Sequence, residues 1–155
     1  GVMEYYKELR KFIGHRPLIL VGSVVLVVND NNEILLQKRE DNSWGLPGGL
    51  MDLGESIEGT ARREVLEETG LTIGDLHLLG VFSGENYYFK ISNGDEFYSV
   101  TVVFSTRDIR AGELQTSDES YDLVFFDLDN LPPNLTEEYS SYIMPYIENI
   151  KKRVI

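Results

Sequence analysis

Acidic side chains crowd into one short part of this 155-residue chain. Glu64, Glu67 and Glu68 lie together, separated by two apolar residues. Carboxylate oxygens with no Cys or His beside them are the ligands that hard cations such as Mg²⁺ or Mn²⁺ accept, whereas zinc sites use nitrogen and sulfur. These residue types therefore indicate chemistry assisted by Mg²⁺, with Mn²⁺ as the alternative metal.

The segment that carries these acids is predicted to be a helix from Ser56 to Thr69. Ser56 is a residue type that caps a helix N-terminus, and Gly70 is suited to ending a helix in the left-handed conformation. At about 100° per residue, Glu64 and Glu68 fall within or beside the apolar stripe of the helix. That stripe consists of Ile57, Ala61 and Val65.

Carboxylates on an apolar face are costly. They lose hydration and repel one another, at a cost of about several kcal/mol per buried ion unless a partner neutralises them. Arg63 precedes Glu67 by four residues and is placed to form an i,i+4 ion pair with it. Few other basic residues lie nearby, which favours a divalent cation as the remaining partner. The positions of the residues around the helix do not exclude the alternative that this is an acidic surface helix with ordinary salt bridges.

The rest of the chain reads as strands with few helices, which predicts a mixed sheet with helices on its faces. Segment 41–54 is expected to be largely loop, and Asn93-Gly94 to turn a hairpin. Thr136 is expected to cap the last helix, which Pro145 would kink or break. The predicted helices outside the acidic segment span 3–13 and 137–152, and the predicted strands 17–28, 33–39, 76–82, 86–91, 97–106 and 121–128.

Composition limits the classes of partner. The length fits a single domain over residues 1–155. A net charge of −12 disfavours sequence-independent binding to the phosphates of DNA. No apolar run is long enough to span a membrane. The absence of cysteine fits a reducing, cytoplasmic location. The sequence leaves open whether the chain is a monomer or a homodimer.

The spacing of the charged residues is more specific than the wheel. Residues 49–71 spell G-x5-E-x7-R-E-U-x-E-E-x-G-U, where U is aliphatic. This pattern resembles the Nudix box, the signature of the MutT-like Nudix hydrolases, and every fixed position is met. The segments WGLPG at 44–48 and FFDLDNL at 125–131 also resemble the family, so the likeness runs from about Leu18 to Pro132.

The resemblance implies a fold, a reaction and a site. The implied fold is of the α/β class, α+β type, with a mixed curved sheet sandwiched between helices. The implied reaction is Mg²⁺-dependent hydrolysis of a pyrophosphate bond in a nucleoside diphosphate linked to another moiety. The implied metal ligands are Glu64, Glu67, Glu68 and the main-chain carbonyl of Gly48, and the implied partners of these ligands are Arg63 and Glu55.

The resemblance leaves the general base open. Glu64 is the first choice, within a catalytic set that also includes Glu67 and Arg63. Some members of the family use an acid from a later loop, for which Glu119 and Asp122 are the candidates here. The alternative is that these two are ordinary loop acids.

Substrate choice depends on residues outside the box. Family members that cleave dinucleoside polyphosphates tend to carry a Tyr roughly 16 to 18 residues after it, and those that cleave ADP-ribose tend to carry a Pro there. Tyr87 and Tyr88 lie 16 and 17 residues after Leu71. This favours dinucleoside polyphosphates, then ADP-ribose-like sugars, then modified nucleoside triphosphates. Trp44 and Arg39, which lie before the box, are further candidates for substrate binding.

Either tyrosine is expected to stack on a nucleobase, although alternation along a strand lets only one face the site. The alternative is that Tyr87, Phe89, Phe97 and Tyr98 form cross-strand aromatic pairs of a hairpin.

Three alternative functions fit the sequence less well than hydrolysis does. A Nudix-type isomerase of isoprenoid diphosphates relies on a cysteine, and this chain has none. A Nudix-derived transcription regulator needs a DNA-binding domain, whereas only 24 residues follow Leu131. A non-catalytic nucleotide-binding module would have lost carboxylates of the box, and none is lost.

Overall fold

Two helices sandwich a sheet whose central strands are buried on both faces. The computed structural model describes residues 4–118 and 121–153. The helices are α1 (Glu4–Ile13), α2 (Ile57–Thr69), α3 (Glu137–Arg153) and the short 3-10 helix η1 (Glu85–Tyr87). The strands are β1 (Leu18–Val27), β2 (Glu33–Lys38), β3 (Trp44–Gly45), β4 (Gly48–Leu50), β5 (Leu71–Ile73), β6 (His77–Phe82), β7 (Tyr88–Lys90), β8 (Glu96–Thr106), β9 (Ile109–Gly112) and β10 (Asp122–Asp127).

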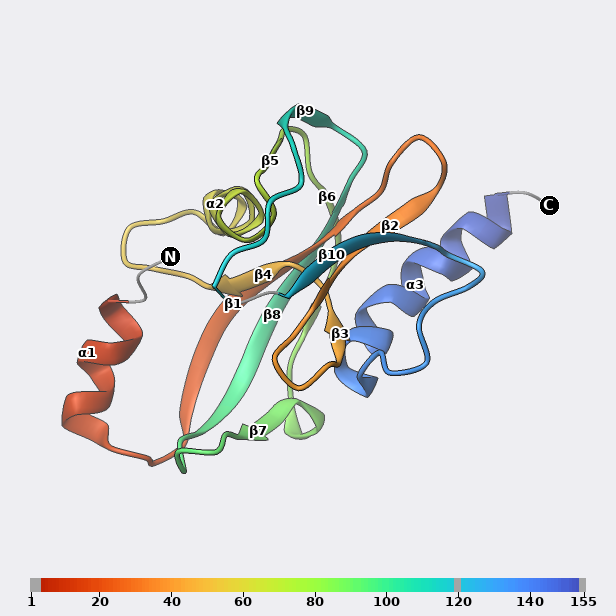
Figure 1. Ribbon diagram of the computed structural model, residues 1–155. Coiled ribbons are helices and arrows are strands. Elements are labelled where there is room, and N and C mark those ends of the chain that lie inside the picture. The colour runs from red at the N-terminus through yellow and green to blue at the C-terminus, as the bar shows by residue number, and fades with distance from the viewer. Residues whose placement is uncertain (1–3, 119–120, 154–155) are drawn as a thin grey trace.

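The strands form three hydrogen-bonded sheets (Figure 1). The largest has the order β4-β1-β8-β6, with β7 also pairing β8. A parallel ladder between β1 and β8, from Leu18 opposite Phe97 to Val27 opposite Thr106, lies at its centre. The other pairs, including those of the β10-β2-β3 and β5-β9 sheets, are antiparallel. The predicted α+β fold with a mixed sheet is thus confirmed.

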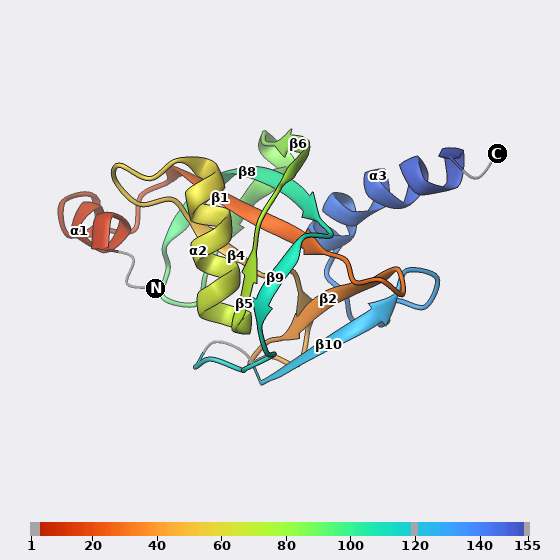
Figure 2. The same cartoon turned by 90° about the horizontal axis from the view of Figure 1, so that it is seen from above.

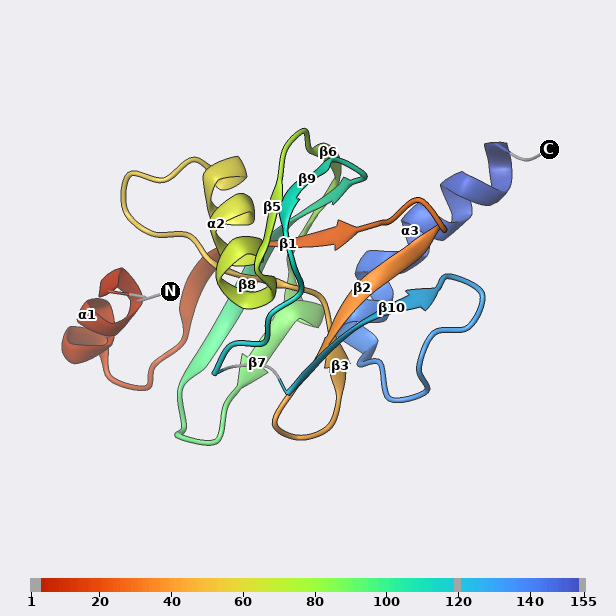
Figure 3. The same cartoon turned by 45° about the horizontal axis from the view of Figure 1, so that its top comes forward.

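Strand β1 shows why the sequence here is a continuous apolar run. Its side chains alternate between two core clusters, with Val24 and Leu26 in one and Val25 and Val27 in the other. The first cluster contains residues of α3, and the second contains residues of α2. Each fully buried Val or Leu contributes about 1.5–3 kcal/mol, so both faces of β1 anchor a helix. In Figures 1 to 3, α1 and α3 lie on opposite sides of the molecule.

The segment 41–54, predicted to be largely loop, contains the short strands β3 and β4. Strand β4 pairs antiparallel with β1, with Gly48 opposite Val24. A Cβ at Gly48 would collide with the Ser23 carbonyl oxygen, so this approach requires glycine. Strands of two or three residues are too short to show periodicity, which explains why the prediction missed them.

Other predictions differ from the structure at the edges of elements. The strand predicted over 86–91 is a 3-10 turn followed by β7, because Gly84 adopts a φ of 108° and turns the chain. The β7–β8 hairpin is confirmed, with Gly94 at a φ of 95° in its turn. Strands β5 and β9 were not predicted.

The last helix α3 begins where predicted and continues through Pro145 without a break. Proline removes one backbone hydrogen bond, and the burial of Tyr142, Ile143 and Ile147 in the core offsets that loss. Within the part of the chain that the structure describes, no helix is both long and apolar enough to cross a membrane.

Candidate active site

Helix α2 presents the clustered carboxylates, and both of its predicted ends are confirmed. The Ser56 hydroxyl accepts a hydrogen bond of 2.9 Å from the backbone N–H of Gly59, and Gly70 ends the helix with a φ of 81°. Glu64 and Glu68 are only 3% and 5% exposed, as the wheel predicted. The helix therefore turns charged groups toward the interior, where they need partners.

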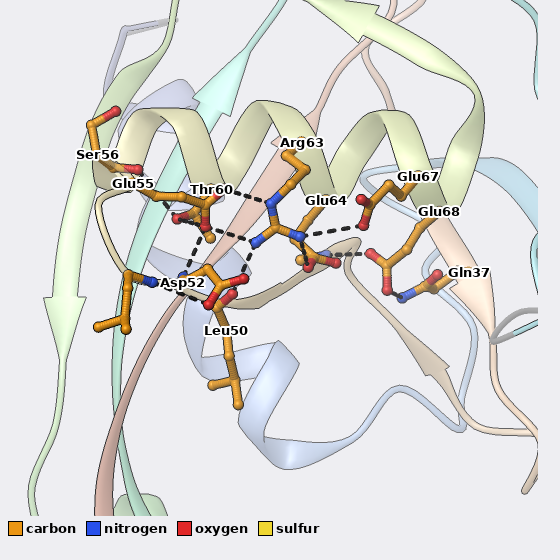
Figure 4. A network of polar contacts seen from close by, with 12 residues as sticks. Gln37, Leu50, Asp52, Glu55, Ser56, Thr60, Arg63, Glu64, Glu67 and Glu68 are labelled. Carbon is orange, nitrogen blue, oxygen red and sulfur yellow. Dashed lines mark hydrogen bonds and ion pairs between the residues drawn. The ribbon is translucent and has the colours of Figure 1, made fainter. Parts of the chain in front are cut away.

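Arg63 is the main partner of Glu64 and of two further carboxylates, Glu55 and Glu67 (Figure 4). Its Nε lies 2.5 Å from Glu55 Oε2, and its Nη1 lies 2.6 Å from Glu64 Oε1 and 3.3 Å from Glu67 Oε2. Its Nη2 also donates to the Leu50 carbonyl at 3.1 Å, which ties the helix to β4. One guanidinium thus faces three carboxylates, and the cluster keeps an excess of negative charge.

The electrostatics differ between the acids of this cluster. Hydrogen bonds from Arg63 lower the pKa of Glu55 to about 2. Burial raises the pKa of Glu64, although the ion pair with Arg63 opposes the change. The Arg63 guanidinium has its pKa raised, chiefly by Glu55. Glu64 is therefore the better proton acceptor of the two acids.

Glu68 is held separately from Arg63. Its Oε2 accepts a hydrogen bond of 2.7 Å from the backbone N–H of Gly48, and its Oε1 lies 3.5 Å from Gln37 Nε2. A Cβ at Gly49 would lie 2.7 Å from both carboxylate oxygens of Glu64. Because glycine has no side chain, Gly48 and Gly49 of β4 can bring their main-chain atoms close to the carboxylates of α2.

These residues fit a hard divalent cation in their chemistry. The donors are carboxylate oxygens, those of Glu64 and Glu68 are buried, and the negative charge of the cluster exceeds the positive charge of Arg63. Within residues 4–118 and 121–153, no three acidic, histidine or cysteine side chains converge closely enough to hold a metal as they stand. Arg63 contacts one carboxylate oxygen of Glu64 and one of Glu67.

A pocket of about 330 Å³ opens beside the cluster, over one face of the β1–β8 ladder. Its polar end is formed by Arg39, Glu68, Glu138 and Tyr139 together with Gly48 and Gly49. Its apolar end is formed by Leu20, Leu50, Phe89 and Phe97. This volume and the mixture of an apolar lining with a few charged groups are typical of small-molecule sites.

Three residues of the polar end come from outside the predicted box. Arg39 follows β2, donates to the Tyr139 hydroxyl and has its guanidinium carbon 5.0 Å from the Tyr139 ring centre. Its Nε is buried without a hydrogen-bond partner among the described residues. The Glu138 carboxylate accepts a hydrogen bond of 2.9 Å from the Tyr142 hydroxyl, and burial raises the pKa of Glu138. The Arg39 Nε is therefore a buried donor that the described residues leave unpaired, which is uncommon in folded proteins.

The two predicted tyrosines lie elsewhere. Tyr87 stacks on Tyr142, with centres 5.9 Å apart, and its hydroxyl lies 3.0 Å from Ser141 Oγ. Tyr88 faces away from the pocket, contacts Tyr98 and donates to Glu96. Neither side chain lines the pocket. The pairs that cross the hairpin are Tyr88 with Tyr98 and Phe89 with Phe97, so the aromatic-pair alternative was right except for Tyr87.

Of the remaining residues predicted for the site, one lines the pocket and the others that the structure describes do not. Arg39 lines the pocket, whereas Trp44 packs edge-to-face on Phe126 at 4.9 Å, outside the lining. Asp122 is exposed at the start of β10 and accepts a hydrogen bond from the N–H of Leu123. Glu119 lies outside the described residues.

Sequence reasoning missed Glu138, Tyr139, Phe89 and Phe97 as pocket residues. Acids in the first turn of a helix are common because they favour the positive end of the helix dipole, so Glu138 carried no distinct signal. Alternation along the strand could have indicated the phenylalanines. Phe89 lies on the opposite strand face from Tyr88 and Lys90, so if the tyrosine faces away from the pocket, Phe89 faces it.

The low pKa of Glu55 predicts a pH dependence of stability. A carboxyl whose pKa is about 2 in the folded chain, below its ordinary 4.5, stabilises the fold fully above pH 4.5. That contribution is lost as the pH falls toward 2. We expect the free energy of unfolding to drop between pH 6 and pH 3 by about 1–2 kcal/mol more in the unmodified chain than in Glu55→Gln. Urea denaturation at both pH values measures this, and equal losses would contradict it.

Comparison with known proteins agrees with this geometry. A model of the NUDIX domain family matches residues 19–146. The ADP-ribose pyrophosphatase of Methanocaldococcus jannaschii is 34% identical over 91% of this chain and 80% of its own length. The oxidized purine nucleoside triphosphate hydrolase of Danio rerio is 35% identical over 71% of this chain and 67% of its own.

A solved structure shares the fold closely as well. The crystal structure of a MutT Nudix hydrolase from Burkholderia pseudomallei superposes with a TM-score of 0.70 and 31% identity, over 83% of this chain and 98% of that one. The family match covers most of the chain, including α2 and the pocket beside it. On these findings, the chain belongs to the Nudix family and is a hydrolase of the pyrophosphohydrolase type.

Proposed function

We propose that this protein hydrolyses the pyrophosphate bond of ADP-ribose, or of a closely similar nucleoside diphosphate sugar, in a reaction that depends on Mg²⁺. The observation that carries the reaction class is the carboxylate cluster of α2, with Glu64 and Glu68 buried, which lies beside a pocket with an unpartnered arginine donor. The observation that favours this substrate is the long match to an enzyme named for ADP-ribose. The products would be AMP and ribose 5-phosphate.

Members of this family generally use a divalent metal. In this chain Glu64, Glu67 and Glu68 would hold it, with the Gly48 carbonyl as a further donor, and Mn²⁺ is expected to substitute for Mg²⁺. A bound Mg²⁺ supplies charge neutralisation at the phosphates and lowers the pKa of water. Arg63 and Glu55 would keep the carboxylates in place, since a guanidinium held by Glu55 has few other orientations.

The residues of the chain supply the other requirements of the reaction. Glu64 would accept the proton of the attacking water, because burial raises its pKa toward the range of a useful base. Arg39 would bind a phosphate oxygen through its unpartnered Nε. Tyr139, which contacts Arg39 through both hydroxyl and ring, would hold that guanidinium at the pocket wall.

Dinucleoside polyphosphates rank lower in this proposal than the sequence suggested. That ranking rested on two tyrosines outside the pocket lining: Tyr87 packs against the core on Tyr142, and Tyr88 pairs with Tyr98 on the opposite face of the hairpin. Oxidised nucleoside triphosphates are the second candidate, because the Danio rerio relative is named for them.

The test is a panel of substrates analysed by chromatography with Mg²⁺ at mildly alkaline pH. It contains ADP-ribose, a dinucleoside polyphosphate, a nucleotide sugar and normal and 8-oxo nucleoside triphosphates. We expect AMP from ADP-ribose with the highest kcat/KM. Faster cleavage of another compound would replace the substrate, and measurable binding without turnover of any compound would support a non-catalytic nucleotide-binding module instead.

Arg39→Met is expected to raise KM by about ten- to a hundredfold, because a charge-assisted hydrogen bond to phosphate contributes about 1.5–3 kcal/mol. Steady-state kinetics on the best substrate measure this. The matched control is Arg16→Met, which removes an exposed arginine that does not line the pocket. A KM that is the same in both variants would exclude Arg39 from phosphate binding.

A further inference from the structure

The apolar end of the pocket has features that the reaction itself does not use. Phe89 and Phe97 face each other across the β7–β8 hairpin, with ring centres 5.3 Å apart and planes inclined by 28°. Both rings are half-buried and line the pocket, and neither belongs to the two core clusters. This separates them from Tyr87, whose ring packs against the core.

The next inward side chain on β8 has an unsatisfied hydroxyl. Ser99 is 7% exposed and lines the pocket, and its Oγ has no hydrogen-bond partner among the described residues. The other three hydroxyls of the lining are satisfied: Ser23 donates to the Val102 carbonyl, Thr101 hydrogen-bonds Tyr142, and Tyr139 accepts from Arg39. A buried hydroxyl left unpaired costs about 1–3 kcal/mol, so Ser99 is a position that a ligand would complete.

The register of the sheet places these groups at a fixed distance from the phosphate end. Gly48 lies level with Val24 on β1 and with Val103 on β8, whereas Ser99 lies four residues before Val103. At about 3.3 Å per residue, Ser99 is about 13 Å along the ladder from that level, and Phe97 lies two residues beyond it. A nucleotide whose phosphates lie at Gly48 and Glu68 therefore extends its nucleoside toward Ser99 and the phenylalanines.

We propose that this end of the pocket is the nucleoside subsite: the nucleobase stacks against the wall formed by Phe89 and Phe97, and the Ser99 hydroxyl hydrogen-bonds the nucleoside. The subsite rests on the proposed function for the placement of the phosphates. Aromatic stacking accepts any base, because every base has a π-face, whereas a buried hydroxyl selects for a ligand that can pair with it. The residues that select the nucleoside thus come from β7 and β8, outside the box.

The experiment measures AMP affinity by isothermal titration calorimetry with Mg²⁺ for the unmodified chain, Phe97→Leu and Ser99→Ala. The matched control is Tyr98→Leu, which alters the next residue of β8, on the opposite face of the sheet. Inorganic pyrophosphate is the second probe, because it has no nucleoside. We expect Phe97→Leu to weaken AMP binding about tenfold and Ser99→Ala about three- to tenfold, with Tyr98→Leu and all pyrophosphate affinities changed less than about twofold.

AMP affinities equal to that of the control in both variants would overturn the subsite, as would an equal loss of pyrophosphate binding. If circular dichroism shows that Phe97→Leu does not fold, the nearly isosteric Ser99→Ala decides alone. The proposed function fails separately, because a chain that binds AMP in this pattern but leaves ADP-ribose intact would keep the subsite and lose the activity.

Discussion

Replacing Glu68 or Glu67 by glutamine is expected to lower kcat by about a thousandfold or more while the fold stays intact. Each change removes a charge that would bind the metal, and charge stabilisation by a metal contributes about several kcal/mol to the transition state. In Glu68→Gln the side-chain amide oxygen can still accept the hydrogen bond that the Gly48 N–H donates to Glu68 at 2.7 Å. Steady-state kinetics at saturating Mg²⁺ measure kcat, and thermal unfolding measures the fold.

Glu58→Gln is the matched control for this experiment. Glu58 lies on the same helix but is exposed in its first turn, so its loss should leave kcat within about twofold. If Glu67→Gln and Glu68→Gln also kept the unmodified kcat at saturating Mg²⁺, the assignment of the metal site would be wrong.

Arg63→Met is expected to have the largest effect on stability, a loss of about 3 kcal/mol in the free energy of unfolding. The change leaves Glu64, which is 3% exposed, without its 2.6 Å ion pair, and also removes the anchor to the Leu50 carbonyl. In a domain of this size the melting temperature should fall by about 6–12 °C. Arg62→Met, which loses one hydrogen bond to the Gly74 carbonyl, should cost about 1 kcal/mol.

A double-mutant cycle identifies the cause of this loss. In Arg63→Met/Glu64→Gln the buried carboxylate is gone, so we expect the double variant to lose at least about 1 kcal/mol less than the sum of the single variants. Additive losses would show that Arg63 stabilises the fold through packing and Leu50 rather than through the buried charge of Glu64.

Local signals were sufficient to predict helix α2 and the burial of Glu64 and Glu68. The cap at Ser56, the left-handed end at Gly70 and the apolar stripe all lie within one segment, and each acts over one helical turn. The same holds for the i,i+4 pair of Arg63 and Glu67, found at 3.3 Å. A pattern read along a single helix needs no knowledge of what packs against it.

The pocket could not be predicted in this way, because its residues meet only in the folded chain. Arg39 and Tyr139 are 100 positions apart, yet they are in contact. The aromatic residues failed for a different reason: distance from the box selects positions 87 and 88 but does not say which way their side chains point. Tyr87 lies in η1 and stacks on Tyr142, and Tyr88 pairs with Tyr98 on the other face of the hairpin. Alternation along β7 then leaves Phe89, one residue later, as the aromatic side chain that lines the pocket.

The parallel ladder at the centre of the sheet has a consequence for how the protein folds. Each pair between β1 and β8 joins residues 79 positions apart, as the contact of Ser23 with Val102 shows. Closing so long a loop costs entropy before any contact compensates for it, so this ladder should form late and slowly. The pocket floor is the ladder itself, so the nucleotide proposed for this pocket could bind only to chains in which the ladder has closed. Ligands of this protein should slow its unfolding and leave its folding rate unchanged.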